Sequence, residues 1–196
     1  PGDPLFKDVD ESGDITEADR KTIGNPNPDY TFGITNSFSY KDFDLSIFFQ
    51  GSQGGDIFNL TDVQLNNGDA NTTRDYYNNA WTPTNTNTNT PRVGNNSNRE
   101  ISSRFVEDGS FIRLKNIALG YNLPSNITEK LGLEKVRFSV SAQNLLTFTK
   151  YSGLDPEVSY FGGSGVNNVK ANTAQGFDFG NYPTVRSVNF SLNVKF

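Results

Sequence analysis

The last twelve residues, 185–196, constrain the fold of this chain more than any other stretch. They read VRSVNFSLNVKF, so apolar and polar side chains alternate from residue 187 onward, and the last residue is Phe196. Successive side chains of a β-strand point to opposite faces, so this alternation predicts a strand with one apolar and one polar face. A soluble sandwich and a wall between lipid and an aqueous lumen both contain such strands. The other segments must distinguish these two folds.

Residues 30–50 predict a β-hairpin of the same kind. Two alternating stretches, 30–40 and 43–50, are separated only by Lys41 and Asp42, which form a minimal reversal. Strands of about ten residues are long enough for a tilted crossing of a bilayer. Aromatic residues stand near the strand ends, as in the interfacial girdles of membrane proteins: Tyr30, Tyr40 and Phe43. Asp44 is expected on the polar side, as a lumen residue or as a charge at the edge of a girdle.

The connections between the predicted strands alternate in length. Strands are predicted at 30–40, 43–50, 110–123, 135–148 and 185–196. The first and third joins, 41–42 and 124–134, are short, whereas 51–109 and 149–184 are long. Outer-membrane barrels have short turns on one side and long loops on the other, and a sandwich has no reason to sort its connections in this way. We therefore predict an all-β fold: strands of a large antiparallel transmembrane β-barrel with long external loops.

Composition narrows the function classes. The chain has 196 residues, of which 34% are hydrophobic and 13% aromatic, a composition that suits a β protein with polar loops. Its net charge of -5 argues against a nucleic-acid binder. It has neither cysteine nor histidine, so thiolate chemistry and the commonest general base are excluded. The sequence has no apolar stretch long enough for a transmembrane helix and no signal peptide. Because it starts at Pro1 in what looks like the middle of a sequence, we expect a fragment or processed piece of a longer chain.

Residues 8–19, DVDESGDITEAD, have the spacing of an EF-hand-like calcium loop. A hard cation needs several oxygen ligands from a loop that curls around it. The candidate ligands are Asp8, Asp10, Ser12, the backbone carbonyl of Asp14, and Asp19, which stands where the loop usually has Glu. Gly13 permits the sharp turn, and Ile15 is expected to anchor the loop to a core. A solvated acidic turn before a short helix is the alternative interpretation.

The two long segments contain the remaining candidate residues. Residues 51–104 predict a polar loop with one short helix around 70–80, and the low-complexity run 82–91 predicts extended loop. Aromatic side chains in these segments could stack on sugar rings: Tyr76, Tyr77, Trp81 and Tyr160. They suit the outer mouth of a transporter, or alternatively a secreted, calcium-stabilised β-sandwich that binds carbohydrate. No nucleophile elbow or P-loop motif occurs, so we predict that the chain is not an enzyme.

Three long stretches and the terminal strand carry a resemblance to a known family. They read KDVDESGDITEADRKTIGNPNPDYTFGITNSFSYKDFDLSIFFQGSQGGDIFN, FVEDGSFIRLKNIALGYNLP and SAQNLLTFTKYSGLDPEV, followed by the strand that ends at Phe196. Together they resemble the C-terminal part of the SusC/RagA-type TonB-dependent outer-membrane transporters. The resemblance covers essentially the whole chain. It divides the chain into an external acidic loop segment, 1–29, and C-terminal barrel strands and loops, 30–196.

The resemblance implies a 22-stranded barrel with an N-terminal plug, of which this chain would form the last few strands. It implies import of large nutrients, commonly glycans and in some members peptides, across the outer membrane of a Bacteroidetes-like Gram-negative bacterium. The implied partners are a SusD-like lipoprotein, the TonB complex (through an N-terminal part absent from this sequence), the rest of the barrel and outer-membrane lipid. Phe196 matches the terminal aromatic residue read by the barrel-assembly machinery. Asp8, Asp10, Asp14 and Asp19 match the family's acidic loop, whereas Ser12 departs from it.

Overall fold

The computed structural model describes residues 1–66, 71–94, 96–158 and 175–196. They form two compact units, which we call the sheet unit and the loop unit. The sheet unit consists of Pro28–Gly54, Gly109–Lys150 and Tyr182–Phe196, and the loop unit of Pro1–Asn27, Gly55–Asp108 and Tyr151–Asn181. Each unit is assembled from three segments of the chain, so that long-range pairing defines both.

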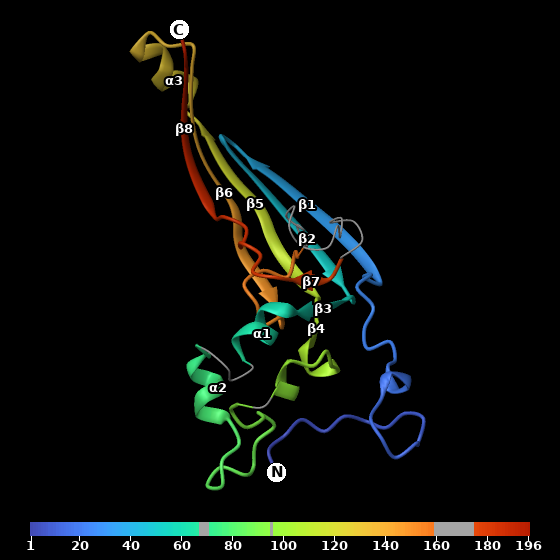
Figure 1. Ribbon diagram of the computed structural model, residues 1–196. Coiled ribbons are helices and arrows are strands. Elements are labelled where there is room, and N and C mark those ends of the chain that lie inside the picture. Colours follow the sequence, from blue (N-terminus) through green and yellow to red (C-terminus); the bar gives the residue numbers. More distant parts are fainter. Residues whose placement is uncertain (67–70, 95, 159–174) are drawn as a thin grey trace, which may run out of the picture. The chain divides into compact units, whose positions relative to one another are not determined.

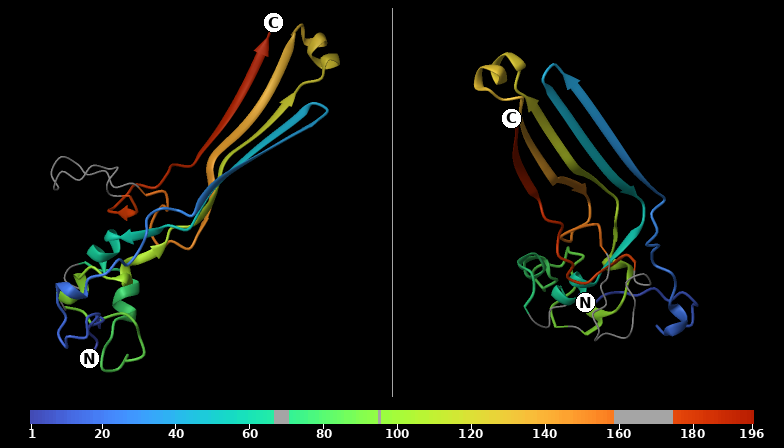
Figure 2. Two further views of the ribbon diagram at one scale, coloured as in Figure 1. Left: turned by 90° about the vertical axis from the view of Figure 1, so that its right-hand side faces the viewer. Right: turned by 90° about the horizontal axis from the view of Figure 1, so that it is seen from above.

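The sheet unit is one antiparallel sheet of five strands in the order β1-β2-β5-β6-β8 (Figure 2). Its strands are β1 (Tyr30–Tyr40), β2 (Phe43–Gln53), β5 (Phe111–Asn122), β6 (Lys135–Thr149) and β8 (Ser187–Lys195). The five strands predicted from alternation are therefore confirmed. Lys41 and Asp42 join β1 to β2, and the helix α3 (Ser125–Thr128) with the 3-10 turn Glu129–Leu131 lies between β5 and β6. Because the strands are antiparallel, both short joins lie at one end of the sheet and both long connections leave from the other.

The strand register gathers most of the large apolar side chains on one face of the sheet. One transverse row crosses all five strands and contains Phe38, Leu45, Leu119, Val140 and Phe190. The adjacent row faces the other way and is polar or small: Ser39, Asp44, Gly120, Ser139 and Ser191. Large apolar side chains of the first face are exposed, among them Phe38 at 58% and Phe190 at 81%. A contiguous exposed apolar face of this kind marks a surface that contacts lipid or a partner.

Two strands depart from ideal register at the same level of the sheet. The pairing of β5 with β2 skips Lys115, and the pairing of β5 with β6 shifts between Leu114 and Asn116. In β6 the irregularity includes Asn144, which has a φ of 51° and donates its side-chain amide to the Val185 carbonyl at 3.1 Å. Bulges bend a strand and increase its twist. The pairing of β8 with β6 begins at Gln143, beside this bend.

The loop unit has a small sheet and its own apolar core. Its strand β3 (Asp56–Asn59) pairs antiparallel with β4 (Val106–Asp108) and parallel with β7 (Phe177–Asp178). The helices α1 (Leu60–Leu65) and α2 (Arg74–Asn79) follow β3 in the chain (Figure 1). Buried apolar side chains come from β3, from the two helices and from the segments around them: Ile57, Val63, Tyr76, Ala80, Phe105 and Tyr151. The short helix was predicted, but the expectation that the rest of 51–104 is a simple polar loop is wrong, because these scattered apolar residues build a core.

Within the described ranges, no helix has both the length and the apolar character that a membrane crossing requires.

Candidate functional site

The acidic loop brings three of its five predicted ligands together. One carboxylate oxygen each from Asp8, Asp10 and Asp19 lies within 4.8 Å of the others. Asp19 is therefore folded back onto the start of the loop, although ten residues separate it from Val9. The convergence of three carboxylates produces a concentrated negative charge that a hard cation would neutralise.

Asp19 closes the loop through backbone hydrogen bonds. Its carboxylate accepts the Val9 N–H at 2.6 Å and the Thr16 N–H at 2.6 Å. Thr16 caps the 3-10 turn Glu17–Asp19, so that Thr16 and Asp19 form a reciprocal capping box. These N–H donors, that of Thr16 first and that of Val9 second, hold the pKa of Asp19 below its usual value. The carboxylate is therefore ionised, as a metal ligand must be.

The turn in the middle of the loop follows the predicted chemistry. Gly13, with a φ of 90°, donates its N–H to Asp8 at 2.8 Å. The Ser12 hydroxyl donates to the Asp14 carbonyl at 3.1 Å, which places the predicted serine and carbonyl ligands side by side. The Asp14 side chain is exposed, consistent with a role for its carbonyl alone. Ile15 is also exposed, so the expectation that it anchors the loop to a core is wrong.

These donors suit calcium. The carboxylates, the hydroxyl and the carbonyl are all oxygen ligands, which hard cations prefer, and Asp8, Asp10 and Asp19 already converge in the structure. Asp8, Asp10, Ser12, Asp14 and Asp19 are thus the residues that would hold the ion.

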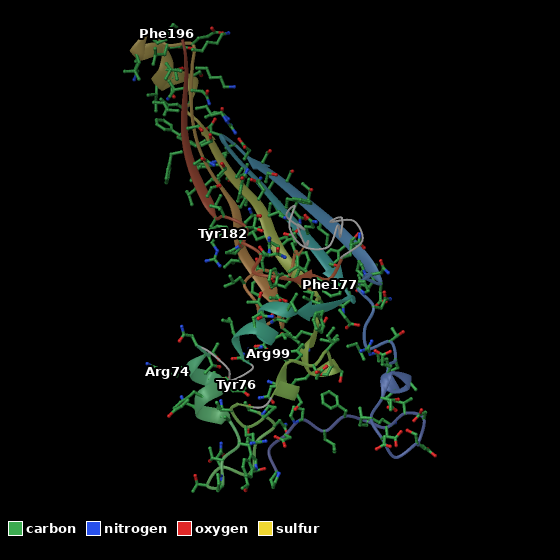
Figure 3. All side chains as sticks on the ribbon, viewed as in Figure 1. Arg74, Tyr76, Arg99, Phe177, Tyr182 and Phe196 are labelled. Atoms are coloured by element: carbon green, nitrogen blue, oxygen red, sulfur yellow. The ribbon has the colours of Figure 1, made fainter. Side chains whose placement is uncertain are left out.

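The four candidate aromatic residues do not form one platform. Tyr76 is only 3% exposed; its hydroxyl donates to the Pro91 carbonyl at 3.2 Å and accepts from the Asn98 amide at 3.1 Å. It is a core residue of α2 (Figure 3), so its ring is not available to a sugar. The i,i+4 spacing of Tyr76 and Ala80, both buried, is a signal that could have shown this.

The neighbouring aromatic residues differ. Tyr77 is 71% exposed and is able to meet a ligand. Trp81 is half-buried, and its ring covers Gly2 so closely that a Cβ added there would lie 2.6 Å from ring atoms. Tyr160 lies outside the described residues. Phe196 follows β8, at the end of the sheet that carries the short joins, and its side chain is 89% exposed (Figure 3).

A buried polar network in the loop unit was not predicted. The Tyr151 hydroxyl donates to the Asp178 carboxylate at 2.5 Å, and both side chains are buried. The next residue, Ser152, donates its N–H and its hydroxyl to Glu107, each at 2.8 Å. Asn59 donates its side-chain amide to the same Glu107 at 2.9 Å. These hydrogen bonds tie together four places that are far apart in the chain, and sequence patterns do not reveal such pairings.

The chain is similar in sequence to several known receptors. No protein-family model matches the chain. TonB-dependent receptor P3 of Formosa agariphila is 52% identical over 196 residues, which are 100% of this chain and 19% of that protein. TonB-dependent receptor SusC of Bacteroides thetaiotaomicron is 27% identical over 199 residues, 100% of this chain and 18% of that protein. The chain thus spans about a fifth of the length of the curated relatives it matches.

Solved structures agree with the sequence relatives. The open-open state of the RagAB peptide importer matches with a TM-score of 0.69 and 26% identity, over 87% of this chain and 17% of that chain. The antiparallel sheet therefore corresponds to a sector of a receptor barrel, as predicted. On the combined likeness of sequence and fold, the chain belongs to the TonB-dependent receptors of the SusC and RagA kind.

Proposed function

We propose that the chain is part of an outer-membrane importer that takes up large nutrients with energy from TonB. The observation that carries this proposal is the exposed apolar face of the five-stranded sheet, exemplified by Phe38 and Phe190. Burial of one such side chain is worth about 1.5–3 kcal/mol, so an uncovered face would be unfavourable in water. Lipid would cover it, while the opposite, mostly polar face would line an aqueous lumen.

The proposed location is the outer membrane of a Bacteroidetes-like Gram-negative bacterium. The partners would be the rest of the barrel, TonB and a SusD-like surface lipoprotein. The likeness to SusC and to RagAB, which is described as a peptide importer, supports this assembly. The substrate class is oligosaccharides and glycans, with peptides as the second possibility. The terminal Phe196, with its exposed ring, would serve as the signal for the barrel-assembly machinery.

The importer proposal is tested by uptake. A strain lacking the full-length receptor is grown on single glycans or on peptides as the carbon source, with the intact receptor or a receptor lacking its TonB-contacting segment restored. We expect loss of growth on one nutrient class and rescue only by the intact receptor. Equal growth of all strains on every nutrient would contradict the proposal. Affinity purification of the receptor from the same cells tests for the lipoprotein.

We also propose that the acidic loop binds calcium. The matched variants are Asp10→Asn, which removes one of the three converging carboxylates, and Asp14→Asn, which alters only an exposed side chain. Calorimetric titration of the full-length receptor should show that D10N weakens calcium binding at least tenfold, whereas D14N leaves it unchanged. Binding that is unaffected by D10N, or absent from the parent receptor at millimolar calcium, would contradict the calcium site.

The structure disfavours the alternative, a secreted β-sandwich that binds carbohydrate. A sandwich buries one face of each sheet against the other. Here most of the large apolar residues of the five strands share one face, and many of them are exposed, including Ile34, Leu146 and Leu192. Tyr76, one of the aromatic residues on which this alternative relied, belongs to a core.

A further inference from the structure

The first segment of the loop unit, Pro1–Asn27, is attached to its second segment, Gly55–Asp108, at two places. The first anchor is at residues 2–3. Asp3 forms an ion pair with Arg92, with Oδ1 2.5 Å from Nε, and the Gly2 carbonyl accepts the Arg92 N–H at 2.8 Å. Gly2 has a φ of 81° and lies under the Trp81 ring, so only glycine fits there.

The second anchor is at residues 24–25. The Asn25 N–H donates to the Asp56 carboxylate at 2.8 Å, and the Asn25 carbonyl accepts the Asp56 N–H at 2.7 Å. Gly24 is tightly packed, because a Cβ there would lie 3.1 Å from the Asp56 carboxylate and from Val106. The first anchor therefore holds the region of Trp81 and Arg92, and the second holds β3 and β4.

Between the anchors the chain is largely exposed and bonded to itself. The side chain of Leu5 is 98% exposed. The hydrogen bonds of the acidic loop run between its own residues, with the loop ends joined where Val9 donates to Asp19. Because the ends meet, residues 9–18 add almost nothing to the reach of the segment. Opening the loop would release up to roughly 33–36 Å of extended chain.

We infer that residues 4–23 are a strap whose length is set by closure of the acidic loop, and that this strap couples the loop to the region of Trp81 and Arg92. With the loop closed, only residues 4–8 and 19–23 span the distance between the two anchors, and the strap restrains both. With the loop open, the strap is slack and the first anchor loses its restraint. The inference is independent of the calcium proposal, because the loop is closed here by its own hydrogen bonds.

Hydrogen exchange on the full-length receptor tests the strap, with EDTA present so that no cation contributes. Asp19→Ala removes the carboxylate that closes the loop, and Glu17→Ala is the control in the same loop, because the exposed Glu17 side chain forms an ion pair with Arg20 instead of bridging the loop ends. We expect D19A to speed exchange of peptides covering 77–92 at least threefold relative to E17A. The Trp81 N–H, bonded to Thr90, and the Arg92 N–H, bonded to Gly2, report on this region.

A second variant gives the reverse test. Arg92→Ala weakens the first anchor by removing its ion pair with Asp3, so exchange near Trp81 should rise while the Thr16 amide, inside the loop, stays protected. Peptides of β5 and β6 show in each variant that the sheet is intact. Exchange of 77–92 that is the same in D19A and E17A, with Thr16 deprotected in D19A, would overturn the inference. Equal protection of Thr16 in D19A and the parent would overturn it also, because closure would then not depend on Asp19.

Discussion

Arg137 of β6 reaches across Gly120 of β5 to bind Asp44 of β2 through both terminal guanidinium nitrogens, Nη1 and Nη2. The Nη1–Oδ1 and Nη2–Oδ2 distances are 2.6 and 2.8 Å. The pair lies on the polar face, and Nη1 is also 3.3 Å from the Asn122 amide oxygen. Gly120 makes the crossing possible, because a Cβ there would lie 2.6 Å from Arg137 Cζ and 2.7 Å from Asp44 Oδ1. A bidentate pair of this kind joins three strands in a fixed geometry.

Gly120→Ala should destabilise the barrel wall, because the added methyl group displaces the Arg137 guanidinium from Asp44. Overpacking of a tight site costs about 1–3 kcal/mol. The measurement is thermal unfolding of the full-length receptor, followed by the mobility shift of heated samples on a gel. Ser191→Ala, in the same transverse row, is the control and should unfold as the parent does. An unchanged midpoint in G120A would show that the pair tolerates the methyl group.

Tyr151→Phe should destabilise the loop unit, because it leaves the buried Asp178 without its hydroxyl donor. Loss of a partner from a buried polar group costs about 1–3 kcal/mol. Denaturant unfolding with limited proteolysis of the loop unit measures the loss. Tyr77→Phe, an exposed neighbour of the core, is the control and should have no effect.

The same tyrosine predicts a dependence on alkaline pH. Burial, followed by the hydrogen bond to Asp178, raises the pKa of Tyr151 above its ordinary value of 10.0. The folded state then holds the phenol proton more tightly than the unfolded state, so this contribution to stability is full below pH 10 and is lost as the pH rises further. Stability measured from pH 8 to 11.5 should fall more steeply in the parent than in Y151F. Parallel curves would contradict the assignment.

Asp62→Asn should preserve or increase the stability of the loop unit at neutral pH. Burial raises the pKa of Asp62 above 3.8, although its carboxylate accepts a hydrogen bond from Asn66. A raised folded pKa means that the favourable contribution of the protonated form is lost as the pH rises from about 4 toward neutral. The advantage of D62N should therefore disappear below pH 4. Glu100→Gln, at an exposed site, provides the comparison, and a D62N variant less stable than E100Q at pH 7 would contradict this account.

Adjacent tyrosines should behave differently. Tyr76→Ala removes a core ring and is expected to cost about 3–5 kcal/mol, the range for large aromatic truncations. Tyr77→Ala removes an exposed ring and should change stability by less than about 0.5 kcal/mol. If Tyr77 contributes to a binding surface, Y77A will weaken substrate binding without loss of stability. Proteolytic sensitivity of the two variants side by side decides the first part.

The sheet could be predicted from the sequence, because each strand shows its own period-two alternation of apolar and polar residues. The predicted strands β1, β5 and β6 end within one residue of those observed, and β2 extends three residues further, to Gln53. The bulge at Lys115 was not predicted, since it depends on the registers of both neighbouring strands. The convergence of Asp8, Asp10 and Asp19 could be predicted for the same local reason, because these residues lie within a stretch of twelve.

The core and the polar network of the loop unit could not be predicted, because both bring together residues that are far apart in the chain. Ser152 and Glu107 are separated by 45 residues, and Tyr151 and Asp178 by 27. Some glycines pack against an aromatic ring that is distant in the sequence, as Gly2 does under Trp81. A single sequence shows the glycine but not the side chain that covers it.

The most direct test of the proposed barrel wall compares two adjacent positions on β8. The chain has no cysteine, so Phe190→Cys and Asn189→Cys in an otherwise cysteine-free full-length receptor give single labelling sites on opposite faces. Each is labelled with a bimane fluorophore and reconstituted with lipids that carry spin labels in the acyl chain. The account predicts strong quenching at position 190 and little at 189, where a water-soluble quencher should act instead. Equal lipid quenching at both positions, or quenching at 189 alone, would contradict it.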